Sequence, residues 1–179
     1  MRYPSQAWRT PLRNGLNALA EALHDIFERD GTPLLGDVWK ARDAYGHAVS
    51  QDADARRAFS AAQLDSTATP DQKRRVAELL EMERDAMRMF TSCAWFFDDI
   101  SGVEPVQNLL YAARAIQLAQ TALKVDLEPP FLDILATAES NVSEVGNGRV
   151  LYERQVRPRK VDLAKAFAHY AITSLFQRY

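Results

Sequence analysis

Cysteine is almost absent from this 179-residue sequence, in which Cys93 is the only one. A single cysteine cannot form an intrachain disulfide, so the composition gives no indication of an oxidising compartment. The first ten residues, MRYPSQAWRT, lack the apolar core of a signal peptide. No window approaches the roughly 20 apolar residues that a membrane span needs. The sequence therefore predicts a cytoplasmic protein with no membrane partner.

The chain also has few glycines and a small net charge. Seven glycines are few for a fold built on tight turns, which argues against an all-β protein. A formal net charge of −2 provides no long-range field suited to nucleic acid, so we expect no nucleic-acid partner. Hydrophobic residues make up 47% of the chain, enough for one hydrophobic core, and this length is most simply a single domain over residues 1–179.

The motifs of several enzyme classes are missing as well. The sequence has no Gly-x-Ser-x-Gly elbow, Walker loop or dinucleotide fingerprint, so hydrolytic triads and nucleotide chemistry have no support. Glu21 and His24 have the spacing found in di-iron bundles, but such a site needs that motif twice and two further glutamates. We therefore predict no metal and no cofactor.

Basic residues gather between Arg149 and Lys160. Such a run could meet an anion, but Glu153 interrupts it and no stacking aromatic platform accompanies it. A solvated or domain-facing strip is the interpretation that these residues favour.

What the sequence contains in abundance is helical periodicity. Apolar residues recur at steps of three and four over residues 8–27, which predicts a helix that begins near Thr10 or Ser5 and ends at Asp30-Gly31. Asp37 is expected to cap a shorter helix that carries Val38 to Val49, and a further short helix is expected over residues 55–64.

A second long helix has the clearest start signal in the chain. Thr69 and Gln72 form a capping box around Pro70, and helical periodicity continues from Val76 to Phe97. We predict one helix that stops only at the Ser101-Gly102 turn. Cys93 would lie in it between apolar neighbours, as a buried and inert residue.

Three further segments complete the pattern. Glu104-Pro105 begins a long helix that ends before residues 128–130, and a short helix is expected over residues 131–138. Residues 139–149 are predicted to be a loop, and residues 150–156 fit a short strand and a helical turn equally well. Residues 161–176 predict a last amphipathic helix. The sum is an all-α fold, an irregular helical bundle of four long and two or three short helices.

The stretch TSCAWFFDDISGVEP, residues 91–105, differs from the rest of the chain. On the predicted helix, Trp95 lies one turn before Asp98 and Asp99, and an aromatic face beside carboxylates is a common way to hold a sugar ring. Neighbouring residues on a helix diverge by about 100 degrees, whereas glycosidase carboxylates face each other across roughly 5–10 Å. Catalysis by this pair is therefore not expected.

An alternative interpretation of the same stretch is packing alone. In that case Trp95 and the two phenylalanines that follow it belong to the core. Asp98 or Asp99 then caps the next helix or pairs with Arg114.

Residues 81–120, EMERDAMRMFTSCAWFFDDISGVEPVQNLLYAARAIQLAQ, resemble the signature of domain of unknown function 3536. This helical domain typically follows the catalytic barrel in bacterial proteins related to glycoside hydrolase family 57. The segments QAWRTPLRNGLNAL and VLYERQVRPRKVDLAKAFAHYAITSLF resemble it in the same order, so the resemblance covers residues 6–176. The matching positions of the central block are Thr91, Ser92, Cys93, Trp95, Phe96, Phe97, Asp98, Asp99, Ser101, Gly102, Glu104, Gln107 and Arg114.

The resemblance implies an accessory helical domain of a carbohydrate-active enzyme, at the C-terminal end of a larger protein. Family 57 relatives act on α-glucans through two carboxylates of their barrel, and a helical chain of 179 residues cannot contain that barrel. The implied partners are the N-terminal catalytic barrel and α-glucan, with no catalytic residue on this chain. The expected contact residues are Trp95, Asp98, Asp99, Glu104 and Arg114. The alternative is a purely structural or protein-interaction bundle without a ligand.

Overall fold

The computed structural model describes residues 4–49, 53–64 and 67–176, and within these ranges the fold is all-α, as the periodicity predicts. An isolated bridge between Glu139 and Asn147 is the only β-type pairing in the described ranges. The helices, in chain order, are α1 (Arg9–Leu35), α2 (Val38–Val49), α3 (Ala53–Gln63), α4 (Pro70–Arg88), α5 (Val103–Leu123), α6 (Glu128–Leu135), α7 (Gly148–Leu151) and α8 (Leu163–Phe176). Short 3-10 helices, Ser92–Phe96 and Arg157–Arg159, and a π-helical turn, Tyr152–Val156, complete them.

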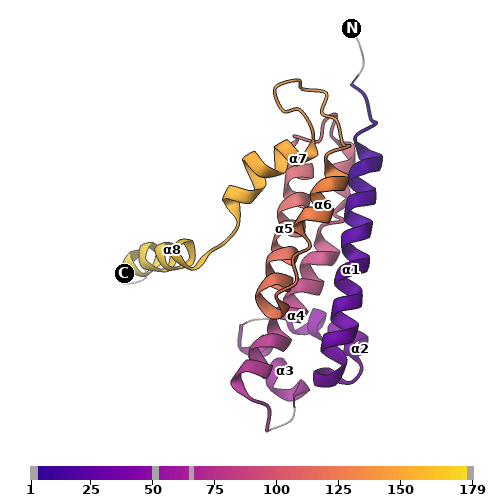
Figure 1. Ribbon diagram of the computed structural model, residues 1–179. Helices are drawn as coiled ribbons and strands as arrows, with labels where there is room; N and C mark the ends of the chain where they lie inside the picture. Colours follow the sequence, from indigo (N-terminus) through magenta and orange to yellow (C-terminus); the bar gives the residue numbers. More distant parts are fainter. Residues whose placement is uncertain (1–3, 50–52, 65–66, 177–179) are drawn as a thin grey trace.

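Three long helices, α1, α4 and α5, run along the length of the bundle, and α6 packs beside α1 (Figure 1). The short helices α2 and α3 lie at one end, while α7 lies at the other, near the start of α1. None of the helices in the described ranges is both long and apolar enough to cross a bilayer.

The core is formed by the apolar stripes of these helices. Full burial of a leucine or phenylalanine side chain stabilises a fold by about 1.5–3 kcal/mol, so these stripes dominate the favourable terms. Alanines on α5, such as Ala112, Ala115 and Ala119, are buried and let the neighbouring helices approach closely. Fully buried large side chains in this core include Trp8, Leu12, Leu16, Leu23, Phe27, Leu79, Leu80 and Leu109.

The first helix begins at Arg9, next to the predicted start at Thr10, but it does not end at Asp30-Gly31 as predicted. Trp8, not Thr10, occupies the N-cap position, and it makes no side-chain cap. The helix passes through Gly31 to Leu35. This glycine leaves room for α2, since a Cβ there would lie 3.0 Å from Val38 Cγ1. The turn comes instead at Gly36, whose φ of +69° is in the region that favours glycine.

The start signals of the next helices are confirmed. Asp37 accepts a hydrogen bond from the Lys40 amide (3.0 Å) at the start of α2. Thr69 and Gln72 form the reciprocal capping box of α4, with hydrogen bonds of 3.2 and 2.8 Å. Each such cap stabilises a helix by about 1 kcal/mol.

The predicted continuation of α4 to residue 101 is wrong, because the helix ends at Arg88. Asn108, fully buried on α5, donates from its side-chain amide to the Thr91 carbonyl (3.1 Å) and accepts from the Thr91 hydroxyl. These contacts hold the chain in a turn where helical propensity alone would continue the helix. A 3-10 helix follows, and Cys93 is exposed there instead of buried.

The choice between strand and helix for residues 150–156 is decided in favour of helix. Asn147 caps α7 by accepting a hydrogen bond from the Val150 amide (3.1 Å), and the chain continues through the π-helical turn. Gly148 lies so close to α6 that an added Cβ would be 2.8 Å from the Leu135 carbonyl oxygen.

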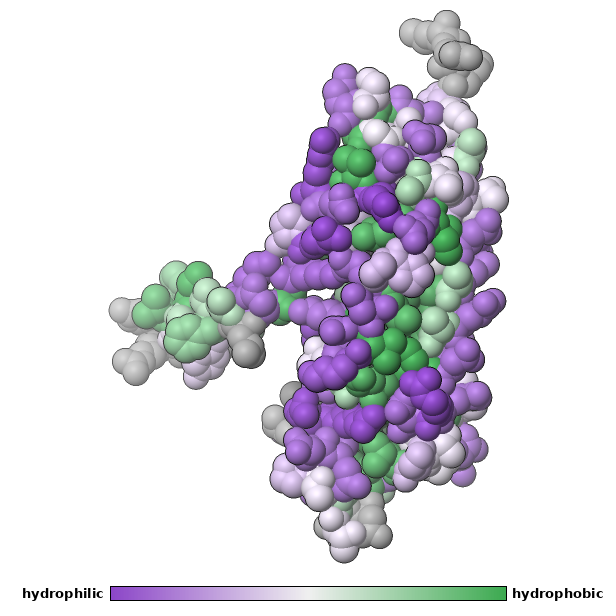
Figure 2. Space-filling view, viewed as in Figure 1, coloured by the Kyte–Doolittle hydropathy of each residue, from purple (hydrophilic) through white to green (hydrophobic). Residues whose placement is uncertain are grey.

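The predicted C-terminal helix is present as α8, but it does not pack on the bundle. Asp162 caps it through the Lys165 amide (2.7 Å), and α8 extends away from the other helices (Figure 1). Figure 2 shows it as a largely hydrophobic lobe that is separate from the bundle. Its large exposed side chains are Phe167 (72% exposed), Tyr170 (71%), Ile172 (58%), Leu175 (70%) and Phe176 (75%).

The glycine environments predict opposite effects of alanine at two positions. Gly148→Ala places a methyl group against backbone and should destabilise the fold by about 1–3 kcal/mol. Gly46→Ala meets nothing within 4 Å in the exposed middle of α2 and should stabilise it by about 0.5–1 kcal/mol. Urea denaturation of both variants measures the difference, and a shift of the same sign in both would contradict the packing argument.

Candidate functional site: the α4–α5 corner and two polar clefts

Trp95, the central aromatic residue of the predicted site, is packed within the fold. Its ring stacks on Trp8, the N-cap residue of α1, with centroids 6.4 Å apart and an interplanar angle of 11°. The Arg13 guanidinium lies 5.1 Å from the Trp95 centroid and 5.2 Å from that of Phe90. Stacking and cation–π contacts of this kind contribute roughly 0.5–1.5 kcal/mol each, so Trp95 joins the corner to α1.

Asp99 connects the corner to the loop that precedes α7. Its carboxylate accepts hydrogen bonds from the Ser101 amide (2.8 Å) and hydroxyl (2.6 Å), the Ser140 hydroxyl (2.9 Å) and the Asn141 amide (2.5 Å). Burial favours a higher pKa for Asp99, but the hydrogen bonds from Ser101, Asn141 and Ser140 outweigh it and hold the pKa below its ordinary value. The carboxylate is therefore a charged structural acceptor.

Asp98 contributes to the same corner through its backbone. Its carbonyl oxygen accepts hydrogen bonds from Trp8 Nε1 (3.2 Å) and from the side-chain amide of Asn141 (2.6 Å), while its side chain is exposed. The two adjacent aspartates thus differ: the carboxylate of Asp99 is used within the fold, and that of Asp98 faces solvent.

The remaining predicted residues lie along α5. Glu104 is half-buried in the first turn, where a negative charge interacts favourably with the helix dipole. Arg114 is ten residues further on, about 15 Å along the axis, and lines a different cleft. The structure therefore brings Trp95, Asp98 and Asp99 together and separates Arg114 from them.

Phe96 is the side chain of the corner that the packing interpretation places wrongly. It is 82% exposed, whereas Phe97 is half-buried against Gly102, where an added Cβ would lie 2.5 Å from its ring. The 3-10 geometry turns Phe96 outward, and the helical spacing assumed from the sequence gives no signal of this.

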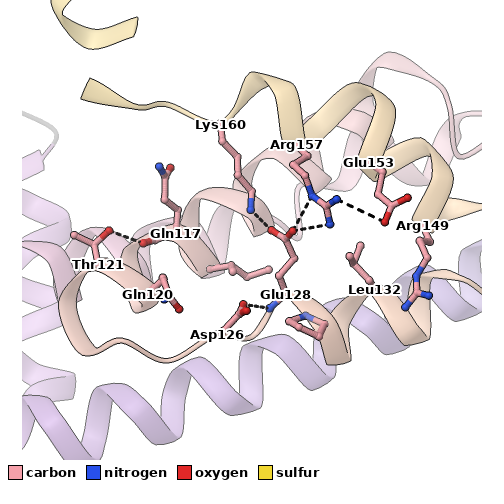
Figure 3. A pocket seen from close by; sticks show the side chains of 12 residues that line it. Gln117, Gln120, Thr121, Asp126, Glu128, Leu132, Arg149, Glu153, Arg157 and Lys160 are labelled. Atoms are coloured by element: carbon pink, nitrogen blue, oxygen red, sulfur yellow. Dashed lines mark hydrogen bonds and ion pairs between the residues drawn. The ribbon is translucent and has the colours of Figure 1, made fainter. Parts of the chain in front are cut away.

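A polar cleft of about 820 Å³ opens where α5, α6 and residues 149–160 meet (Figure 3). At its centre the Glu128 carboxylate accepts hydrogen bonds from Arg157 Nε (2.9 Å), the Tyr152 hydroxyl (3.1 Å) and Lys160 Nζ. Burial lowers the pKa of Lys160, with Asp126 acting in the opposite direction. We call this opening the Glu128 cleft.

The rim of the Glu128 cleft carries further hydrogen-bonding groups. Gln120, Thr121, Asp126, Arg149 and Glu153 line it, and none of its lining residues in the described ranges is aromatic. Such a surface can bind a hydroxylated ligand through hydrogen bonds but offers no stacking platform. Two separate signals of the sequence fall here, a proline-rich helix break at residues 128–130 and a basic run, and neither indicates that they meet.

His24 interacts with a residue that sequence spacing does not suggest. Its Nε2 lies 3.5 Å from Glu83 of α4, and its ring packs edge-on against Trp39 (5.5 Å). Glu21, its expected partner, is exposed. Within the described residues, no group of three or more histidine, cysteine or acidic side chains could hold a metal ion.

Glu83 is fully buried, and neither carboxylate oxygen has a hydrogen-bond partner in the described ranges. Burial raises its pKa to about 7, against the opposing effect of Arg42. Burial also lowers the pKa of His24, and here Arg42 acts in the same direction as burial. The protonation of Glu83 therefore changes near neutral pH.

Comparison with protein families shows that the chain belongs to the family described as Domain of unknown function (DUF3536), whose sequence profile matches residues 5–179. Searches of curated proteins and of solved structures gave no match.

The two aspartates of the corner should respond differently to substitution. Asp99→Asn places an amide against the donors of Ser140 and Asn141, so we expect a loss of about 1–3 kcal/mol in the free energy of unfolding. Asp98→Asn changes an exposed side chain and should alter it by less than about 0.5 kcal/mol. Urea denaturation at pH 7 distinguishes them, and equal losses would show that both carboxylates are structural.

Glu83→Gln should change how stability depends on pH. Because the folded-state pKa of about 7 lies above the ordinary value of 4.5, the folded protein retains a proton that the unfolded chain has released between these pH values. Stability therefore falls as pH rises through this window, by about 3 kcal/mol.

The measurement is a series of urea denaturations from pH 4.5 to 8. Glu83→Gln should be more stable than the wild type at pH 8 and should lack this fall, whereas Glu21→Gln, an exposed control, should retain it. Parallel curves for wild type and Glu83→Gln would show that Glu83 does not titrate in this range.

Proposed function

We propose that this chain is an accessory helical domain of a bacterial, cytoplasmic carbohydrate-active enzyme related to glycoside hydrolase family 57. In this proposal it packs beside the catalytic barrel, uses α8 as its docking element and carries no catalytic residue. The observation that carries the proposal is the uncovered apolar surface of α8, together with the family resemblance.

The apolar surface of α8 is large for its length. At roughly 150–250 Å² per aromatic side chain, Phe167, Tyr170 and Phe176 together expose on the order of 300–500 Å². Ile172 and Leu175 add to this, and the largest apolar patch on a typical monomer is only about 300–600 Å². Apolar side chains that are spread around a helix favour burial on more than one side, as in a groove of a second folded unit.

The corner residues support a non-catalytic role. A glycosidase needs two carboxylates that face each other across a substrate, and Asp99 is already engaged by four donor groups of the fold. We propose that three groups of the corner contact the barrel or the glycan at its edge: Trp95, the exposed carboxylate of Asp98, and Glu104. Arg114 is proposed to make such a contact from α5.

A contribution to α-glucan binding is part of the same proposal. The Glu128 cleft supports it with carboxylate, amide, hydroxyl and guanidinium groups that can bond sugar hydroxyls. The second candidate is a protein-interaction bundle without a ligand, which the exposed α8 favours by itself.

The test uses this 179-residue chain and a family 57-like catalytic barrel as separate polypeptides. Size-exclusion chromatography with light scattering should detect a complex with the wild-type chain. The double variant Phe167→Ser/Leu175→Ser should bind at least about ten-fold more weakly, because it removes the docking surface. Val142→Ser, an exposed apolar residue outside α8, is the matched control and should bind normally.

Two outcomes decide between the candidates. Since α8 does not pack on the bundle, the double variant should keep the wild-type melting temperature. If the double variant binds the barrel as tightly as the wild type does, docking through α8 is contradicted. Calorimetry of maltoheptaose with the complex separates a glucan-binding accessory domain from a bundle with no ligand.

A further inference from the structure

We propose that a second cleft, between α4, α5 and the segment that leads into α8, binds a phosphate-type oxyanion through Arg114 and Arg159. We call it the Arg114 cleft. Its volume is about 330 Å³, and it meets the Glu128 cleft at Gln117 and Lys160, which line both. This inference goes beyond the proposed function, in which Arg114 is only a contact residue, and it rests on charge and geometry at this cleft and not on the apolar surface of α8.

The Arg114 cleft has an excess of positive charge. Arg88, Arg114, Arg159 and Lys160 line it, and Asp85 is the only acidic residue among its described lining residues. This is unusual in a chain whose formal net charge is −2. Electrostatic repulsion among these cations disfavours the empty cleft, and a bound anion relieves it.

Two of these four charges are already compensated. Asp85, which is buried, pairs with Arg88 (3.3 Å), and Glu128 pairs with Lys160. Arg114 and Arg159 form no ion pair with any residue of the described ranges, although the charge of Arg114 acts on the Asp85 carboxylate and favours its ionised form. Two guanidinium groups at one cleft are thus available to an external anion.

Hydrogen bonds position these groups before any ligand arrives. Arg88 lies 4.2 Å from the centroid of the Tyr111 ring and donates to the Tyr111 hydroxyl (3.0 Å). Arg114 donates to the side-chain oxygen of Gln117 (3.1 Å). Gln117 in turn donates to the Val161 carbonyl, which ties the segment that carries Arg159 to α5.

The chemistry of the lining favours phosphate over a simple carboxylate. Guanidinium groups bind tetrahedral and planar oxyanions through paired N–H donors, and two guanidiniums match the two negative charges of a phosphate group. The Tyr111 hydroxyl accepts from Arg88, so its own proton is free to be donated, and Gln107 adds an amide to the lining. A volume of about 330 Å³ is near the lower limit for small-molecule sites and suits a phosphate with a small attached group.

The experiment is isothermal titration calorimetry of the full chain with pyrophosphate and with succinate, at constant ionic strength set with sodium chloride. Pyrophosphate should bind, and succinate should bind at least about ten-fold more weakly. Arg114→Gln/Arg159→Gln should weaken pyrophosphate binding by about ten-fold or more. Arg74→Gln, an exposed arginine on the far part of α4 that pairs with Asp71 and Glu78, is the matched control and should bind like the wild type.

Three results would overturn the proposal. They are an absence of pyrophosphate binding to the wild type, equal weakening by the control substitution, and succinate binding as tight as that of pyrophosphate. Melting curves of all variants accompany the titrations, and the exposed positions of both arginines predict unchanged folding. If the double variant does not fold, the single variants Arg114→Gln and Arg159→Gln replace it, and each should weaken binding on its own.

Discussion

The chain reversal between α4 and α5 is the constraint on which the rest of the structure depends. α4 ends because the buried Asn108 side chain engages both the carbonyl and the hydroxyl of Thr91. An unpaired amide at that depth would cost about 1–3 kcal/mol, so the turn and the burial of Asn108 require each other. Once the chain has turned there, α5 returns beside α4 and their apolar faces close the core.

The same corner joins the start of α1 to the loop that precedes α7. The Asp98 carbonyl accepts from Trp8 at the start of α1, and the Asp99 carboxylate accepts from Ser140 and Asn141 in the loop before α7. Asn141 also bonds both backbone groups of Ser5, through its side chain. Because this loop leads into α7, the corner also determines where residues 149–160 run and hence where both polar clefts open. A stretch that looks like a ligand site from its residues is thus first of all a structural junction.

Most helices, but not all of their limits, could be predicted from the sequence. Local signals, such as the capping box at Thr69 and Gln72 and the cap at Asp37, were sufficient because the groups that interact are only three residues apart. The predicted ends at Gly31 and at residue 101 are wrong. Gly31 lies against Val38 of α2 and the end of α4 is bonded by Asn108 of α5, and both partners are on other helices. Helical periodicity in one segment carries no information about such tertiary partners.

The candidate sites, too, could be predicted from the sequence only in part. Trp95, Asp98 and Asp99 stand out in the sequence as an aromatic beside two carboxylates. The different contacts of the two aspartates, however, follow from Ser140 and Asn141, about forty residues away. The pairing of His24 with Glu83 and the joining of Glu128 to Arg157 and Lys160 likewise need the fold. Arg114 was singled out by its match to the family, and only the structure supplies Arg159 beside it.

The forces that hold the C-terminal segment differ from those that hold the bundle. Residues 157–161 attach to α5 and α6 chiefly through Glu128 and Gln117, by ion pairs and hydrogen bonds at a partly exposed surface. Ion pairs at such surfaces contribute about 0–1 kcal/mol each, far less than the buried apolar stripes of α1, α4 and α5. The bundle is therefore held by buried apolar contacts, whereas the segment that leads into α8 is joined to it by polar contacts that salt weakens. Arg159, Lys160 and Val161 belong both to that joint and to the Arg114 cleft, so a ligand in the cleft would act on the part of the chain that orients α8.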